Sequence, residues 1–162
     1  MKGKNLMKKS QLKLVSIVAL IVIVLDQISK FLVTKYVVQN NEIQNFGINI
    51  FYNTGMAFGF NSGNSRNIIL SFLVIFIIVW FLKNQIGNID KKTSVAIAMM
   101  LGGGISNLID RFFRKGVLDF IKILFIPYFN IADLCICTGW MLIIVFLIIY
   151  SREPINKDKL EG

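Results

Sequence analysis

The chain has 162 residues, of which 55% are hydrophobic and only 17% are charged, and its formal net charge is +9. A membrane-spanning helix needs about 20 mostly apolar residues, so four of them would occupy about half of such a chain. This balance excludes a soluble enzyme, a disordered chain and a disulfide scaffold, and it predicts one integral membrane domain over residues 1–162.

Four apolar runs predict four membrane-spanning helices, at about residues 14–33, 68–83, 93–110 and 131–150. Five lysines precede the first run, as they do in a signal peptide. That run is nevertheless expected to be retained, because it is long, contains charged residues and lacks a small-x-small cleavage site. The expected fold class is therefore an all-α membrane protein.

The segments between the runs differ in character. Residues 36–66 are polar and rich in Asn and Gly, and alternating apolar residues within them predict a small β element. Residues 111–128 mix basic and apolar side chains, which favours a short helix lying in the membrane interface. The cations of this connector suggest contact with lipid headgroups or with a substrate.

The third run carries Ala98, Gly102 and Ser106 at four-residue spacing. Small residues in such a stripe allow helices to approach closely, so we expect this run to pack tightly against a neighbour. Cys135 and Cys137 lie within the fourth run and are interpreted as small packing residues.

Basic residues are more frequent in the N-terminal segment, the loop between the second and third runs and the C-terminal tail than in the other two connecting segments. Because cytoplasmic segments of membrane proteins are enriched in Lys and Arg, this bias predicts that both termini are cytoplasmic. This topology brings the charged residues in or next to the spans to one depth, near the outer membrane face. Ionisable groups at such positions are candidates for function. They are Asp26, Lys30, Asp110, Arg111, Asp119 and Asp133.

Asp26 and Lys30 are four residues apart on one helix and can form a structural ion pair. Asp119 is flanked by apolar residues, and Asp133, at the start of the fourth run, has no basic partner at helical spacing. If they lie close together in a poorly solvated place, they share a proton and can act as a general base and a general acid. Two separately satisfied acids explain the spacing equally well.

Other chemistries are poorly supported. The chain has no His, which excludes a Ser-His-Asp triad and the usual catalytic zinc sets, and no metal or cofactor is expected. No basic patch interleaved with aromatic residues indicates a nucleic-acid partner. A proton-coupled transporter is the main alternative, although it predicts charges along the whole depth of the membrane. A lipid phosphatase or transferase would need more arginines to clamp phosphate.

Five sequence blocks, in the same order, resemble those of the lipoprotein signal peptidases (signal peptidase II), and the resemblance extends over the whole chain. These blocks are residues 26–30 (DQISK), 53–59 (NTGMAFG), 102–111 (GGGISNLIDR), 117–120 (VLDF) and 129–133 (FNIAD). The resemblance implies a four-span bundle with a small extracytoplasmic β cradle and an interfacial helix, in the bacterial cytoplasmic membrane.

The resemblance also implies an activity and a site. Members of the family remove the signal peptide from prolipoproteins, cutting before a diacylglyceryl-modified Cys, and the cyclic peptide globomycin blocks them. The implied catalytic aspartates are Asp119 and Asp133. The implied residues that bind the substrate or support the site are Asn53, Gly55, Asn107, Arg111, Asn130, Ala132, Asp26, Lys30 and Asp110. The implied partners are prolipoproteins and membrane phospholipids.

This chain departs from the family pattern at two residues. Ser106 stands where the family usually has Gly, and Met56 where it often has Ala. Since Ser is still small, the close helix contact is expected to survive. The connector between the two aspartates is short, which affects the expected shape of the loop but not the carboxylate pair.

Overall fold

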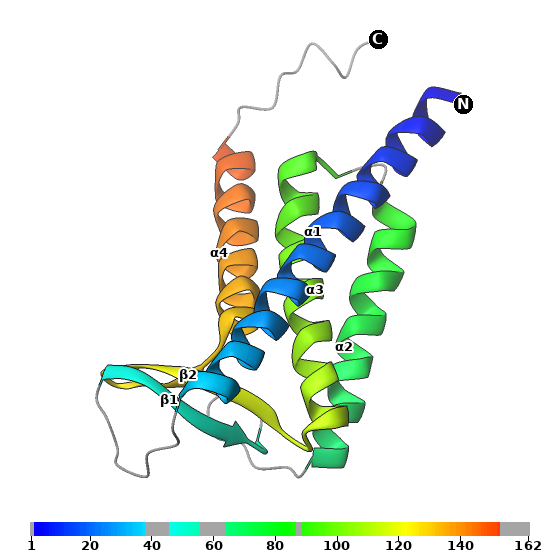
Figure 1. The fold of residues 1–162 in the computed structure, drawn as a ribbon. Helices are drawn as coiled ribbons and strands as arrows, with labels where there is room; N and C mark the ends of the chain where they lie inside the picture. The colour runs from blue at the N-terminus through cyan, green and yellow to red at the C-terminus, as the bar shows by residue number, and fades with distance from the viewer. Residues whose placement is uncertain (1, 38–45, 56–63, 87–88, 153–162) are drawn as a thin grey trace.

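The computed structural model describes residues 2–37, 46–55, 64–86 and 89–152. Its four helices are α1 (Lys2–Tyr36), α2 (Asn64–Gln85), α3 (Lys91–Phe113) and α4 (Ile131–Arg152). They contain the four apolar runs, and each is long and apolar enough to cross a membrane. The beginning of α1 and the end of α4 lie at the same end of the bundle (Figure 1).

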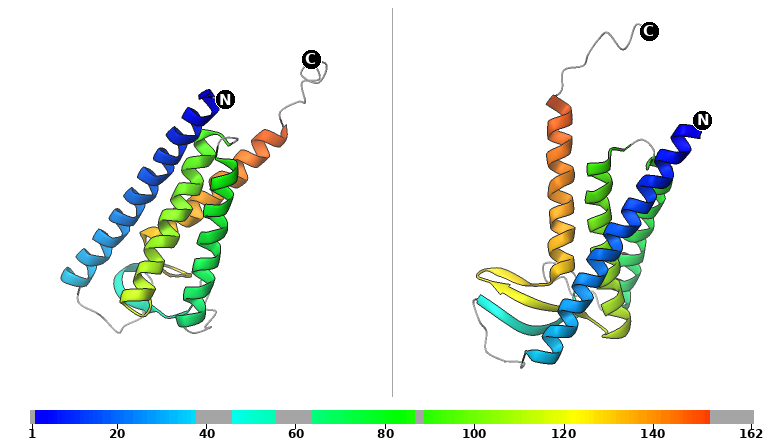
Figure 2. Two further views of the ribbon diagram at one scale, coloured as in Figure 1. Left: turned by 90° about the vertical axis from the view of Figure 1, so that its right-hand side faces the viewer. Right: turned by 45° about the horizontal axis from the view of Figure 1, so that its top comes forward.

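The helix α3 is the centre of the bundle. It packs against α1, α2 and α4, and 61% of its apolar window is buried, against 11 to 22% in the other three helices. The two views of Figure 2 show α1, α2 and α4 arranged around it. The other helices expose many large apolar side chains, as expected of surfaces that face lipid.

Glycines allow α3 to approach its neighbours at backbone distance. A Cβ atom on Gly102 would lie 2.6 Å from the carbonyl oxygen of Ala19 in α1, and one on Gly103 would lie 2.5 Å from that of Ala132 in α4. A Cβ atom on Gly104 would meet only the side chain of Ile75, at 3.7 Å. The close approach predicted from small residues is therefore present, and Gly103 extends it to α4.

The strands form one antiparallel sheet at the end of the bundle opposite to the start of α1 (Figure 1). The strands β1 (Phe46–Asn53), β2 (Val117–Ile123) and β3 (Ile126–Phe129) lie in the order β1-β2-β3. The register of the first pair sets Phe51 opposite Asp119. Residues 46–53 thus form the expected β element, and their partner strand comes from a distant part of the chain.

The structure corrects the expectation for residues 111–128. They contain the end of α3 and most of the β2–β3 hairpin, and no short interfacial helix. The first four residues of β2 are all buried, so they lack the alternation of apolar and polar residues that marks a strand in sequence. The hairpin joins α3 to α4, and it places the ends of both helices beside the sheet.

Candidate functional site

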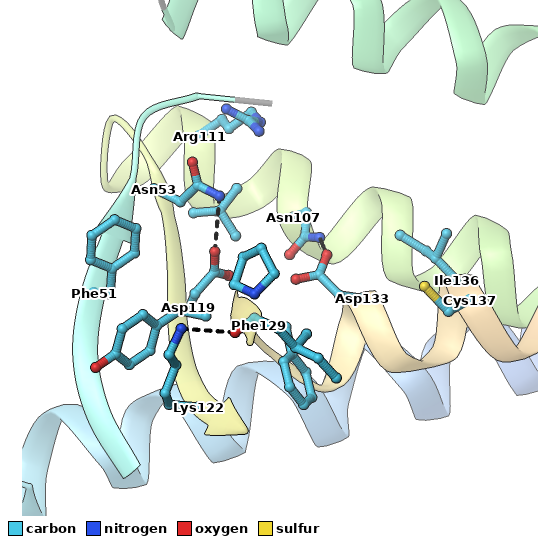
Figure 3. Close-up of a pocket in the computed structure, with 14 residues that line it drawn as sticks. Phe51, Asn53, Asn107, Arg111, Asp119, Lys122, Phe129, Asp133, Ile136 and Cys137 are labelled. Atoms are coloured by element: carbon cyan, nitrogen blue, oxygen red, sulfur yellow. Dashed lines mark hydrogen bonds between the residues drawn. The ribbon is translucent and has the colours of Figure 1, made fainter. Parts of the chain in front are cut away.

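A cavity of about 670 Å³ opens where the sheet meets α3 and α4 (Figure 3). Its polar wall includes the side chains of Asn53, Asn107, Arg111, Asp119 and Asp133. Its remaining wall is largely apolar and aromatic, and comprises Phe51, Val117, Lys122, Ile126, Pro127, Tyr128, Phe129, Ile136 and Cys137. The carboxylates of Asp119 in β2 and Asp133 in α4 therefore share one pocket.

Asp119 projects from β2 and is 2% exposed. Its Oδ2 accepts a hydrogen bond from Asn53 Nδ2 at 3.0 Å, and its Oδ1 accepts one from Asn130 Nδ2 at 2.7 Å. The amide of Asn53 is itself fixed, because its Oδ1 accepts the backbone N–H of Gly55 at 2.9 Å. Two neutral amides therefore hold this carboxyl group.

Burial and, next to it, the negative charge of Asp133 raise the pKa of Asp119 to about 7. The hydrogen bonds from Asn53 and Asn130 and the charge of Lys30 oppose this rise, since they stabilise the carboxylate. Near neutral pH, Asp119 is thus poised between its protonated and ionised forms.

Asp133 lies in the first turn of α4, where the sequence forms a capping box. The backbone N–H of Asp133 donates to Asn130 Oδ1 at 2.8 Å, and the N–H of Asn130 donates to Asp133 Oδ2 at 3.3 Å. The other carboxylate oxygen, Oδ1, accepts from Asn107 Nδ2 at 2.8 Å. Asn130 therefore contacts both aspartates, which brings residues 119 and 133 into one hydrogen-bonded network.

Arg111 reaches across from α3 to the segment that follows β1. Its Nη2 donates to the carbonyl oxygen of Gly55 at 2.9 Å. The neighbouring Asp110 makes different contacts, as its place next to Arg111 on a helix predicts: its Oδ2 accepts from Lys30 at 2.8 Å and from the N–H of Leu118 at 3.0 Å. The two neighbouring charges thus tie α3 to two different parts of the site.

Behind the pocket lies a buried polar cluster between α1 and α3. Lys30 pairs with Asp26 at 2.6 Å, as their spacing on one helix face predicts. Asp26 also accepts the backbone N–H of Ala132 at 2.9 Å, and Ala132 is fully buried. Most residues that the sequence marks for this site thus line the pocket or lie in this cluster. The other three are hydrogen-bonded to such residues: Gly55 to Arg111, Asn130 to Asp119, and Ala132 to Asp26.

Three members of this cluster were not among the predicted site residues. Gln27 Nε2 donates to Asp110 Oδ1 at 2.9 Å and to Ser106 Oγ at 3.0 Å, and Ser106 Oγ donates to Asp26 Oδ2 at 2.7 Å. Arg114 pairs with Asp110, a contact that the interpretation of the basic connector did not include. The sequence signal that could have identified Gln27 is its position directly after Asp26, within one of the five sequence blocks.

The aromatic wall was also absent from the prediction. The rings of Phe51 and Tyr128 stack with their centroids 5.3 Å apart, which ties β1 to β3. Lys122 Nζ lies 5.2 Å from the centroid of Tyr128 and donates to the carbonyl oxygen of Ile126 at 2.9 Å. Phe51 lies in the expected β element, but Lys122 and Tyr128 come from β2 and β3, which the sequence did not predict as strands.

The fold and the site define a multi-pass membrane protein with a pair of acids in a pocket at one end of a helical bundle. Residues 18–149 match the family model described as signal peptidase (SPase) II. A lipoprotein signal peptidase of Bacillus pumilus (strain SAFR-032) is 36% identical over 146 residues, which cover 85% of this chain and 94% of that protein. The chain belongs to the signal peptidase II family, and it is a protease.

Two solved structures share the fold, and each is described as a bacterial membrane enzyme determined by the in meso method. The one at 2.3 Å resolution is 28% identical, has a TM-score of 0.76, and the match covers 88% of this chain and 92% of that one. The one at 1.9 Å resolution is 27% identical, has a TM-score of 0.71, and the match covers 86% and 94%. The helices and the sheet are therefore arranged as in known membrane enzymes.

Proposed function

We propose that this protein is an aspartic endopeptidase that removes the signal peptide from prolipoproteins, with Asp119 and Asp133 as its catalytic residues. The substrate is cut before a diacylglyceryl-modified Cys. The observation that carries the proposal is the convergence of the two acids on one pocket, bridged by Asn130, in a chain of the signal peptidase II family.

The proposed reaction needs one ionised and one protonated carboxyl group. The ionised carboxylate accepts a proton from a water molecule, whose oxygen attacks the carbonyl carbon of the scissile amide. The protonated carboxyl then donates its proton to the amide nitrogen as the carbon–nitrogen bond breaks. The raised pKa of Asp119 supports its role as the proton donor, since a pKa of about 7 leaves this group protonated at pH values below neutral.

The surrounding amides support this chemistry. Asn53 and Asn107 each donate a hydrogen bond to one of the aspartates, and both are neutral. They orient the carboxyl groups without adding a positive charge that would hold both acids in the ionised form. Arg111 fixes the Gly55 carbonyl at the same end of the bundle, which supports a role in shaping the substrate channel.

The placement of the site suits a lipidated substrate. The pocket lies at the sheet end of the bundle, and we place this end at the outer face of the bacterial cytoplasmic membrane, with both termini in the cytoplasm. The diacylglyceryl group anchors the substrate Cys at the interface, where the pocket is.

The fully buried charged side chains among the described residues lie at the sheet end of the bundle too. The buried polar residues at the other end, Gln11 and Ser94, are uncharged. A transporter, with charges along the whole depth, therefore gains no support.

The direct test is cleavage by the purified protein in detergent of a diacylglyceryl-modified prolipoprotein, with the unmodified prolipoprotein as its matched control. We expect release of the signal peptide from the lipidated substrate only, and inhibition by globomycin. Equal cleavage of the two substrates, or no cleavage of either by folded protein, would contradict the proposed function.

The pH dependence of cleavage should be bell-shaped with its alkaline limb near pH 7. The pKa of Asp119 is raised to about 7, so this group keeps its proton below that pH and loses it above, and activity falls as the proton donor is lost. At acidic pH the second carboxyl becomes protonated and activity falls again. Initial rates across the pH range, with each sample returned to the optimum to show reversibility, measure this profile. A flat profile from acidic to neutral pH rules out a shared proton.

A further inference from the structure

Lys30 stands at the centre of the buried cluster behind the pocket. Its Nζ lies 2.6 Å from Asp26 Oδ2 and 2.8 Å from Asp110 Oδ2, and all three side chains are 0% exposed. A third partner is Asn107 Oδ1, which accepts from Nζ at 3.1 Å. A buried ammonium group needs such a set of partners, because they replace the water that solvates it in the unfolded chain.

The two carboxylates that hold Lys30 also hold the backbone beside the two catalytic acids. Asp26 Oδ1 accepts the N–H of Ala132, the residue directly before Asp133, at 2.9 Å. Asp110 Oδ2 accepts the N–H of Leu118, the residue directly before Asp119, at 3.0 Å. The ammonium group of Lys30 thus bridges the two carboxylates that hold the backbone directly before Asp119 and Asp133.

The contact with Asn107 acts on a side chain rather than on the backbone. Because Asn107 Oδ1 faces the donors Lys30 Nζ and Asn130 Nδ2, its amide nitrogen is left to face Asp133, and donates to Oδ1 at 2.8 Å. Lys30 therefore favours the amide orientation in which Asp133 receives a hydrogen bond.

We propose that Lys30 is a positioning residue that sets the relative placement of Asp119 and Asp133, through Asp26, Asp110 and Asn107. The proposal rests on the proposed function and deepens it. Lys30 is fully buried, so it acts through these partners and not on the substrate. Ser106 supports this positioning, since its hydroxyl donates to Asp26 Oδ2, the same oxygen that Lys30 binds.

Lys30→Met tests this role, because it keeps an unbranched side chain only one atom shorter and removes the ammonium group. We expect kcat to fall about 10²-fold, the loss that a misplacement of about 1 Å can cause, with KM nearly unchanged. The alkaline limb of the pH profile should move to higher pH, because the charge of Lys30 lowers the pKa of Asp119. Lys35→Met, on the same helix but exposed, is the matched control and should leave both quantities unchanged.

A second variant separates positioning from folding, since Lys30→Met leaves two buried carboxylates short of a partner. In the double variant Asp26→Asn, Lys30→Met, the charges removed cancel, and Asp110 keeps Arg114. The amide oxygen of the new Asn can still accept the N–H of Ala132, while its amide nitrogen can donate to Ser106, whose hydroxyl rotates to suit. We expect thermal stability close to that of the unmodified protein, because removing both partners of a buried pair costs less than removing one. The low kcat should remain.

Two outcomes overturn the positioning role. One is a folded Lys30→Met protein with unchanged kcat and pH profile, and the other is a double variant whose kcat returns with its stability. Asp119→Asn in the same assay separates these outcomes from a failure of the proposed function. If that variant cleaves the lipidated substrate at the full rate, the proposed function fails; if it is inactive, the result for Lys30 bears on positioning alone.

Discussion

Replacing either aspartate by Asn is expected to reduce the rate of signal peptide release by roughly 10²–10⁴-fold, the usual contribution of one acid–base group. Asp119→Asn removes the group that holds the exchangeable proton near neutral pH. Asp133→Asn removes its partner from the same pocket. The measurement is the single-turnover rate on a diacylglyceryl-modified prolipoprotein, with thermal unfolding in detergent as a test that each variant is folded.

The matched control for these variants is Asp90→Asn. Asp90 caps α3, and its carboxylate accepts the N–H of Thr93 at 3.1 Å. Because α3 begins at the end of the bundle opposite to the sheet, this change removes a carboxylate far from the pocket (Figure 1). It should leave cleavage at the rate of the unmodified protein. A folded variant at position 119 or 133 that keeps full activity would exclude a two-carboxylate mechanism.

The second large effect is expected for Asn130→Ala. This change removes the donor to Asp119 Oδ1 and the acceptor for the N–H of Asp133, so both acids lose one fixed contact. We expect kcat to fall about 10²-fold through misplacement of the acids. The free energy of unfolding should fall by about 1 kcal/mol through loss of the helix cap. Steady-state kinetics and denaturation in detergent measure the two effects.

Asp90→Ala separates the loss of a cap from the loss of the contact with an acid. It removes the N-cap side chain of α3, as Asn130→Ala removes that of α4, but it touches neither aspartate. Its expected effect is a lower stability with unchanged kcat. If Asn130→Ala also leaves kcat unchanged, then the bridge between the two acids has no role in catalysis.

The sequence predicts the helices and the gathering of charges well, for physical reasons. A span has to be apolar over its whole length, so runs such as residues 131–150 mark the helices directly. A charge inside a span needs a partner at the same depth, and this requirement pairs Asp26 with Lys30 and brings Asp110 to them.

The contacts that orient the acids could not be predicted in the same way. The partners of Asp119 and Asp133 are the neutral amides of Asn53, Asn107 and Asn130, which carry no charge pattern and mark no depth. The pairing of β2 with β1 joins residues far apart in the chain, and the buried start of β2 hides its period. Only tertiary structure sets these partners.

The capping box at the start of α4 has a consequence for how this protein can evolve. In many enzymes the reactive groups strain the fold, so selection for activity and selection for robustness oppose each other. Here the side chains of Asp133 and Asn130 close the first turn of a helix, and the same two side chains belong to the hydrogen-bonded network of the acids. If the two acids are catalytic as proposed, mutations in this turn are expected to lower stability and catalytic rate together, so that both selective pressures preserve the same two side chains.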